Sequence, residues 1–235
     1  MTMTERPIVS REEWLAARRE LLAEEKRFSR LRDELTRKRQ ALPWVEVAAD
    51  YRFEGAQGEL GLDELFEGRS QLIVQHFMFG PQWSEGCPSC SFWADNYDGT
   101  LAHLAARDIS FAVVSNAPLA KLDAYKARMG WSFRWVSAGG GSFNRDFGVS
   151  FTQAEVDSGE LDYNYAKGRF PTTEAPGISV FNRGADGRLF HSYSCYARGL
   201  DMLNGAYHYM DLVPKGRDEA ELSYSMAWLR RRDCY

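Results

Sequence analysis

The sequence has few cysteines, no long apolar run and little net charge. Four cysteines in 235 residues are too few for a disulfide-built scaffold, so they favour reactive or incidental thiols in a reducing compartment. No apolar run approaches the roughly 18 residues that span a bilayer, and residues 1–6 lack the apolar stretch of a signal peptide. A formal net charge of -4 gives no broad attraction to nucleic acid or acidic membranes. We therefore expect a soluble cytoplasmic protein with neither as a partner.

The composition supports a large core, since 44% of the residues are hydrophobic and 14% aromatic. The length suits one domain with an appendage. We predict an N-terminal helical extension over residues 1–43 and an α/β domain over residues 44–235.

The predicted extension is one helix of about 30 residues, a length inferred from its repeat. Ser10 and Glu13 form a capping box at its start, and Pro43 ends it. Apolar side chains recur every seven residues along it, at Trp14, Leu21, Phe28, Leu35 and Leu42. An apolar stripe of this length is stabilised when it packs against another apolar surface. Partial packing on its own domain is the favoured interpretation, and pairing of two subunits, a possible homo-oligomer, is the other.

The middle of the chain alternates between strand and helix patterns. Residues 44–66 predict a hairpin and a one-turn helix, and the apolar run 71–79 predicts a buried strand. A helix over 87–107, a strand over 109–114, a helix from Pro118 to a cap at Gly130, and a strand over 133–136 follow.

The later part begins with a segment, residues 138–173, that shows no regular pattern and is read as an insert. An antiparallel hairpin over 178–181 and 189–194 is predicted next, with an Asp-Gly turn. Short helices are predicted around 202–209 and 222–229. The chain is therefore expected to form a mixed sheet flanked by helices.

The stretch Gly86-Cys87-Pro88-Ser89-Cys90 is the strongest chemical signal. It follows a predicted strand, and proline suits the first helical position, so both thiols fall in the first turn of a helix. Unpaired amides and the positive dipole end favour a thiolate there. A dithiol redox centre is the favoured interpretation, ahead of a metal site.

Three stretches of the sequence carry a family resemblance: Gly86 to Trp93, residues 186–193 (DGRLFHSY) and residues 196–199 (YARG). With the helix ending in Leu42-Pro43-Trp44, they resemble a bacterial thioredoxin-like family filed as domain of unknown function number eight hundred ninety-nine. The resemblance implies a thioredoxin-like mixed sheet with an insertion before the final hairpin.

The resemblance also implies roles for single residues. Cys87 would attack a disulfide and Cys90, deeper in the helix, would resolve it. Pro176, or failing that Pro171, would be a cis-proline facing the dithiol, and Trp83, Ala175 and Pro176 would contact substrate. The implied partners are protein or small-molecule thiols and disulfides, with no cofactor.

Peroxiredoxins are a more distant resemblance, with the peroxidatic cysteine falling on Cys90. That group expects threonine three residues earlier and proline seven earlier, where this chain has Cys87 and Trp83. Arg183 or Arg198 would then replace the activating arginine, although a structural arginine is the favoured interpretation of both. The third alternative is a non-catalytic thioredoxin-like scaffold that uses its N-terminal helix as a contact surface.

A zinc or iron-sulfur site is disfavoured, because one CxxC motif supplies two of about four ligands. Cys195, Cys234, His76 and His191 could complete such a site if the fold brought them together. We expect no metal. Both histidines are read as structural, Cys195 as a small buried hydrophobe and Cys234 as incidental.

Overall fold

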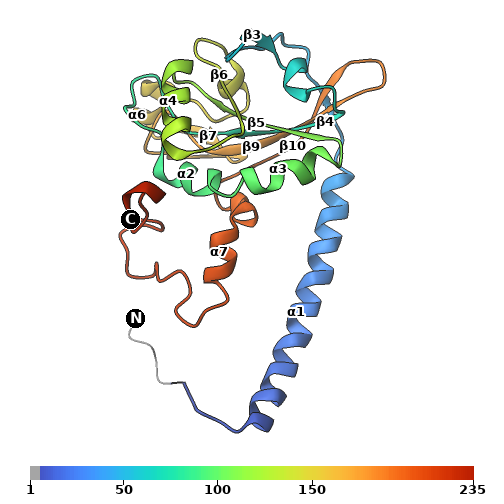
Figure 1. Ribbon diagram of the computed structural model, residues 1–235, viewed down its shortest axis with the longest axis vertical. Coiled ribbons are helices and arrows are strands. Elements are labelled where there is room, and N and C mark those ends of the chain that lie inside the picture. The colour runs from blue at the N-terminus through green and yellow to red at the C-terminus, as the bar shows by residue number, and fades with distance from the viewer. Residues whose placement is uncertain (1–5) are drawn as a thin grey trace.

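The centre of the molecule is an eight-stranded mixed sheet, seen in a computed structural model that describes residues 6–235 (Figure 1). Its strand order is β1-β10-β9-β4-β5-β6-β2-β3. Strands β4, β5 and β6 are parallel neighbours, and the other neighbouring pairs are antiparallel. The strands are β1 (Val45–Glu46), β2 (Arg52–Gly55), β3 (Gly58–Gly61), β4 (Gln71–His76), β5 (Ile109–Ser115), β6 (Arg134–Ser137), β9 (Gly177–Arg183) and β10 (Leu189–Tyr196).

Each face of the sheet has its own hydrophobic core, because alternate strand residues point to opposite sides. In β5, Val113 belongs to one core, while Ala112 and Val114 belong to the other. The first core contains the aromatic side chains that surround Cys90. The second is centred on Phe66, Phe143 and other apolar side chains on the opposite face.

The helices that cover the sheet are short. They are α2 (Pro88–Ala94), α3 (Asp98–Ala105), α4 (Leu119–Met129), α5 (Phe143–Asp146), α6 (Gln153–Ser158) and α7 (Gly205–Met210). Figure 1 shows α2 and α3 along one face of the sheet, with α7 beyond them. Short 3-10 helices span Asp63–Phe66, Ala197–Leu203 and Arg232–Cys234. The predicted thioredoxin-like mixed sheet, flanked by helices, is confirmed by this arrangement.

The long helix α1 (Arg11–Gln40) stands away from the sheet (Figure 1). Its predicted capping box is present, since Ser10 Oγ accepts the Glu13 amide and Glu13 reaches back to Ser10. At the other end, the Arg39 guanidinium lies 5.0 Å from the centre of the Tyr193 ring. No residue of α1 is buried, so the favoured prediction that its apolar stripe packs on its own domain is wrong.

The single helix predicted over residues 87–107 is two helices, α2 and α3. Carboxylates at the end of α2 and the start of α3 bind another segment: Trp131 Nε1 donates to Asp95, and the amides of Ser132 and Phe133 donate to Asp98. These tertiary contacts use the carboxylates at the break. The continuous helical pattern was therefore overridden by packing against residues 131–133.

Two other predictions differ from the structure. Residues 222–229 form turns rather than a helix, because Met226 has a φ of 70° and its amide donates to the Glu219 carboxylate. The insert 138–173 contains α5, α6 and a small sheet of β7 (Leu161–Tyr163) and β8 (Ala166–Gly168). The prediction that residues 1–6 lack the apolar stretch of a signal peptide falls almost entirely on residues 1–5, which lie outside the described residues. Within residues 6–235, no helix is both long and apolar enough to cross a membrane.

Candidate active site

The two cysteines of the CxxC motif lie where β4 gives way to α2. Cys87 is the N-cap of α2, and Pro88 occupies its first turn as predicted. After the loop that follows β4, the backbone comes back to the end of that strand, because the Cys87 amide donates to the Met78 carbonyl at 3.0 Å. The Met78 amide in turn donates to Cys90 Sγ at 3.4 Å. The fold thus holds both sulfurs, the dithiol, at the carboxyl end of a central strand.

The two thiols differ in acidity. Hydrogen bonding from the Cys90 thiol, with smaller contributions from the Cys90 and Ser89 amides, lowers the pKa of Cys87 to about 7 against the opposing effect of burial. Cys90 is only 3% exposed, and burial raises its pKa well above the usual value. Only a thiolate is an effective nucleophile, so Cys87 is the thiol poised to react and Cys90 is held as the protonated partner.

A buried carboxylate, Glu174, faces this region. It is 5% exposed, and burial raises its pKa to about 7. Asn116 Nδ2 donates to both of its oxygens at 3.0 and 3.1 Å. Its charge contributes to the raised pKa of Cys90, so the two groups are electrostatically coupled. Sequence reasoning missed Glu174, because nothing in its local sequence marks it as buried.

Glu174 ends a chain of buried hydrogen bonds that crosses the sheet. Asn144 Nδ2 donates to Asn116 Oδ1 at 3.0 Å, and Asn144 Oδ1 lies 2.9 Å from His76 Nδ1. Beyond His76 the chain continues through Ser179, Ser194 and His191, with separations of 2.9, 2.8 and 2.7 Å.

The direction of donation along this chain is fixed by its two ends. His191 Nε2 also lies 3.0 Å from the Tyr193 carbonyl, which can only accept, so this nitrogen carries a hydrogen. Burial lowers the pKa of His76 to about 4, so its ring is neutral, and Nδ1 is its donor because Asn144 Oδ1 accepts. Every donor therefore points toward Glu174. Such aligned bonds strengthen one another.

The residues predicted to contact substrate border this carboxylate. Trp83 is half-buried beside Gly80: a Cβ at residue 80 would lie 3.1 Å from Trp83 Nε1 and 3.5 Å from Glu174 Cγ. Ala175 is buried, and its amide donates to the Val149 carbonyl at 2.9 Å. The Pro176 carbonyl accepts the Tyr163 hydroxyl at 2.8 Å.

The predicted cis-proline is wrong. The described residues contain no cis peptide bond, so the bonds before Pro176 and Pro171 are both trans. The amide of Ala175 and the carbonyl of Pro176 are each tied to the insert, which holds this connection extended into β9.

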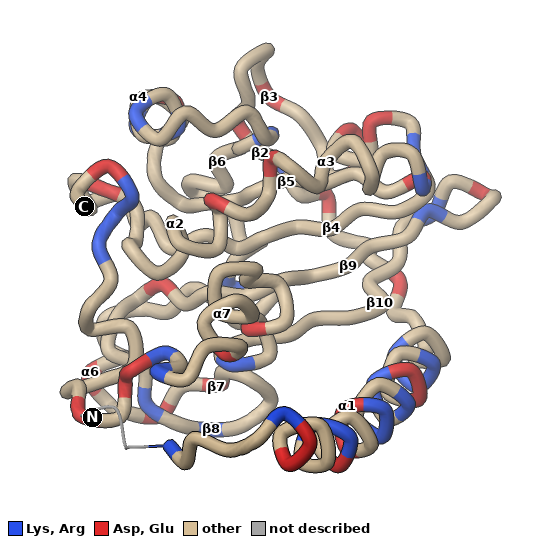
Figure 2. The backbone as a smooth tube through the Cα atoms, turned by 60° about the horizontal axis from the view of Figure 1, so that its bottom comes forward, with Lys and Arg blue, Asp and Glu red and all other residues tan. Residues whose placement is uncertain are grey.

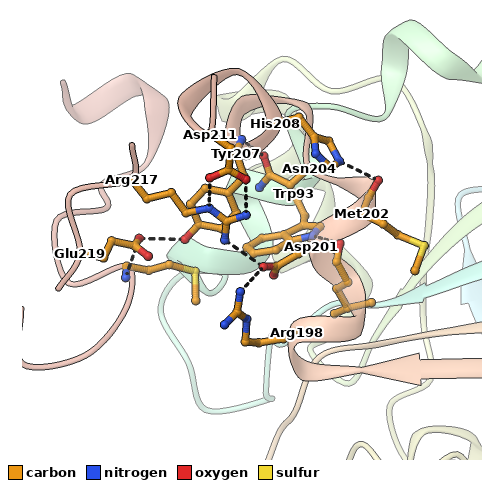
Figure 3. Close-up of polar contacts among 12 residues, drawn as sticks. Trp93, Arg198, Asp201, Met202, Asn204, Tyr207, His208, Asp211, Arg217 and Glu219 are labelled. Atoms are coloured by element: carbon orange, nitrogen blue, oxygen red, sulfur yellow. Dashed lines mark hydrogen bonds and ion pairs between the residues drawn. The ribbon is translucent and has the colours of Figure 1, made fainter. Parts of the chain in front are cut away.

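The segment that follows β10 packs against Trp93 of α2 (Figure 3). Trp93 Nε1 donates to the Leu200 carbonyl at 2.8 Å, and its ring meets Tyr207 edge to face. Arg217 lies over the Tyr207 ring at 3.8 Å and binds Asp201 and Asp211. This cluster ties α7 to the helix that carries the dithiol.

The last residues reach the loop that precedes Cys87. Arg231 Nη2 donates to the Gly86 carbonyl and Nε to the Tyr125 hydroxyl, both at 2.8 Å. The same guanidinium pairs with Glu85 at 2.9 Å. The Tyr125 hydroxyl also lies 2.9 Å from Ser91 Oγ, and this contact links the arginine to the first turns of α2.

The residues considered for a metal site are separated. Among residues 6–235, no group of three or more His, Cys, Asp or Glu side chains could hold a metal ion. His76 and His191 belong to the hydrogen-bond chain, Cys195 is buried with its thiol 3.7 Å from the Gly199 carbonyl, and Cys234 is exposed. The structural interpretations of both histidines and of Cys195 match these contacts.

The two arginines considered as activators have other partners. Arg183 donates to the Asp63 carbonyl at 2.6 Å and lies over the Phe66 ring, on the face opposite the dithiol core. Arg198 is exposed and pairs with Asp201. Their favoured structural interpretation therefore agrees with the contacts.

Comparison with known proteins gives one family and several similar folds. The family model described as "Bacterial protein of unknown function (DUF899)" matches residues 3–235. No curated protein matches the sequence. Solved structures similar to this one include Peroxidoxin BcpB from Mycobacterium tuberculosis, with a TM-score of 0.48, 13% identity, and coverage of 69% of this chain and 93% of the other. A cysteine variant of peroxiredoxin Q from Xanthomonas campestris has a TM-score of 0.46, 16% identity, and coverage of 72% and 98%.

Proposed function

This chain belongs to the family of bacterial proteins of unknown function called DUF899, and we propose that it is a thiol-disulfide oxidoreductase built on Cys87 and Cys90. The observation that carries the proposal is the opposite shift of two neighbouring thiols. The pKa of Cys87 is lowered to about 7, while burial raises that of Cys90. An accessible thiolate followed by a protonated, buried partner is the arrangement that stepwise disulfide exchange requires.

The first step makes a mixed disulfide. The Cys87 thiolate attacks one sulfur of a protein or small-molecule disulfide, the substrate S–S bond breaks, and the other substrate sulfur leaves as a thiolate that takes a proton from water. Cys87 is half-buried whereas Cys90 is buried, which supports Cys87 as the residue that meets substrate. Trp83, Ala175 and Pro176 are the proposed walls of the substrate site.

The second step releases the substrate. The Cys90 thiol loses its proton and the resulting thiolate attacks Cys87 Sγ, with Glu174, ionised in part near neutral pH and electrostatically coupled to Cys90, as the proposed acceptor of that proton. The mixed disulfide breaks, the second substrate thiolate leaves and is protonated, and Cys87 and Cys90 end as a disulfide. Two electrons have passed from the dithiol to the substrate. A reduced thiol donor restores the dithiol, and the reverse sequence would oxidise a substrate dithiol.

The peroxiredoxin alternative fits the geometry less well. It requires Cys90 to be the thiolate that meets peroxide, but this thiol is buried and its pKa is raised. The two arginines considered as activating groups, Arg183 and Arg198, are bound to other partners. We propose the cytoplasm as the place of action, where thiol donors are abundant.

The test is turnover of an artificial disulfide by the purified protein with a dithiol reductant. Cys87→Ser should abolish the rate, and Cys90→Ser should accumulate a mixed disulfide on Cys87, visible as added mass. Cys195→Ser is the matched control, because it removes a buried thiol outside the CxxC motif. A rate in Cys87→Ser equal to that of the wild type, or no turnover in a folded wild type, would leave the non-catalytic scaffold as the better account.

A further inference from the structure

The apolar stripe of α1 is not covered by any other part of residues 6–235. None of the helix's residues is buried, and Phe28 and Leu31 at its middle are 66% and 60% exposed. Further exposed apolar side chains line the same helix and its flanks, at Val9, Trp14, Leu21, Leu35, Leu42 and Trp44. Burial of apolar surface drives association, so a helix of this kind is stabilised when another helix covers the stripe.

Charged residues of both signs occur along α1 (Figure 2), but they are unequally distributed between its two halves. Residues 11–25 hold three basic and five acidic side chains, a net charge of -2, while residues 26–40 hold seven basic and two acidic, a net charge of +5. Interaction with the helix dipole accounts only for the first and last turns. The division extends to the centre, where Glu24 and Glu25 are followed directly by Lys26 and Arg27.

We propose that α1 pairs with α1 of a second copy of this chain, in the antiparallel direction. That direction sets the acidic half of each helix against the basic half of the other, whereas a parallel pair would align halves of like charge. It also extends the apolar contact, because the Val9 and Trp14 end of each helix meets the Leu42 and Trp44 end of the other.

The side chains between the helices specify a register. With the twofold axis between Phe28 and Leu31, Phe28 contacts Leu31 of the partner subunit. With Phe28 at position a and Leu31 at position d of the heptad, the flanking e positions pair Glu25 with Arg32 of the partner subunit, and the flanking g positions pair Arg27 with Glu34 of the partner subunit. Glu24 lies one layer from Lys38 of the partner subunit, while a parallel pair in register would oppose Glu24 to Glu24 of the partner subunit.

The position of the domain permits this arrangement. The sheet lies at the C-terminal end of α1 (Figure 1), and a helix of 30 residues is about 45 Å long. An antiparallel pair therefore sets the two sheets toward opposite ends of the helices. The occupant we assign to the stripe is thus a second copy of this chain.

The first test is the mass of the full-length protein by light scattering at micromolar concentration. The wild type should be a dimer, and the double variant Phe28→Asp, Leu31→Asp should have half the mass with an unchanged thermal transition of the sheet domain. Ser29→Asp adds one negative charge on a different face of the helix and should remain dimeric. A monomeric wild type, or a double variant that remains dimeric, would overturn the proposal.

The second test separates the two directions by disulfide cross-linking. In a background with Cys87→Ser and Cys234→Ser, a mixture of Glu24→Cys and Leu35→Cys chains should give a covalent heterodimer under mild oxidation. Leu35→Cys alone should cross-link at least tenfold less. Efficient self-cross-linking of Leu35→Cys would show a parallel pair and refute the antiparallel assignment.

Discussion

The reactivity of Cys87 should show a crossover with pH. With a pKa of about 7 it is half ionised at pH 7, against about 3% for a free cysteine of pKa about 8.5. The thiolate fraction is therefore about 15-fold larger. A less basic thiolate is a weaker nucleophile, and a Brønsted slope of about 0.45 over this difference reduces its intrinsic rate about fivefold. Cys87 should react about threefold faster than a free cysteine at pH 7 and about fivefold slower above pH 9.5.

Replacement of the second thiol tests the cause. Hydrogen bonding from Cys90 contributes most to the lowered pKa of Cys87, so Cys90→Ala should move the midpoint of alkylation to higher pH. Cys195→Ala serves as the control and should leave it unchanged. The assay is alkylation by iodoacetamide, followed by peptide mass spectrometry from pH 5 to 10, with an unstructured cysteine peptide blocked at both ends as reference.

Two results would refute this reasoning. A wild-type midpoint equal to that of the blocked cysteine peptide would mean that the turn does not stabilise the thiolate. An unchanged midpoint in Cys90→Ala would mean that another group is responsible for the shift.

Three further predictions concern the groups around the dithiol. The folded-state pKa of Glu174, about 7, lies above its unfolded value, so the folded state holds more protons between about pH 4.5 and 7 and stability falls as pH rises through this window. Chemical denaturation at pH 5 and 7.5 should show that the wild type loses about 2 kcal/mol relative to Glu174→Gln, because both proteins share the opposite contribution of His76, whose pKa of about 4 makes stability rise with pH. Equal changes in the two proteins would contradict the assignment. Ser179→Ala removes the donor to buried His76 and should reduce the free energy of unfolding by about 1–3 kcal/mol. Ser192→Ala, at a less buried position, should reduce it by less, and similar losses in the two variants would argue against the hydrogen-bond chain. Arg231→Ala frees the Gly86 carbonyl and should lower the unfolding free energy by about 1–2 kcal/mol in a thermal melt, and an unchanged melt would show that the contact is not stabilising.

Local signals predicted the elements whose cause is local. Ser10 and Glu13 bind each other's backbone, so the start of α1 follows from four consecutive residues. Pro88 in the first turn after Cys87 likewise positions the dithiol without help from distant parts of the chain. The Asp-Gly turn before β10 is a further example, since Gly187 has a φ of 85° that glycine adopts at little cost.

The environment of the dithiol could not be predicted in the same way. Glu174, Asn116 and Asn144 come from three separate connections and meet only because of the strand order. No periodicity or spacing links them. The break before α3 had the same origin, because Asp98 binds amides 34 and 35 residues further along the chain. Polar contacts of this kind depend on tertiary structure, which a pattern of apolar spacing does not encode.

The bond from the Met78 amide to Cys90 Sγ gives the molecule an internal reporter. A thiol and a disulfide sulfur differ in electron density, so the resonance of this one amide proton should shift when the pair is oxidised. Because Met78 stands just beyond β4, a nitrogen-15 spectrum would read the redox state from the main chain, without a label on either sulfur.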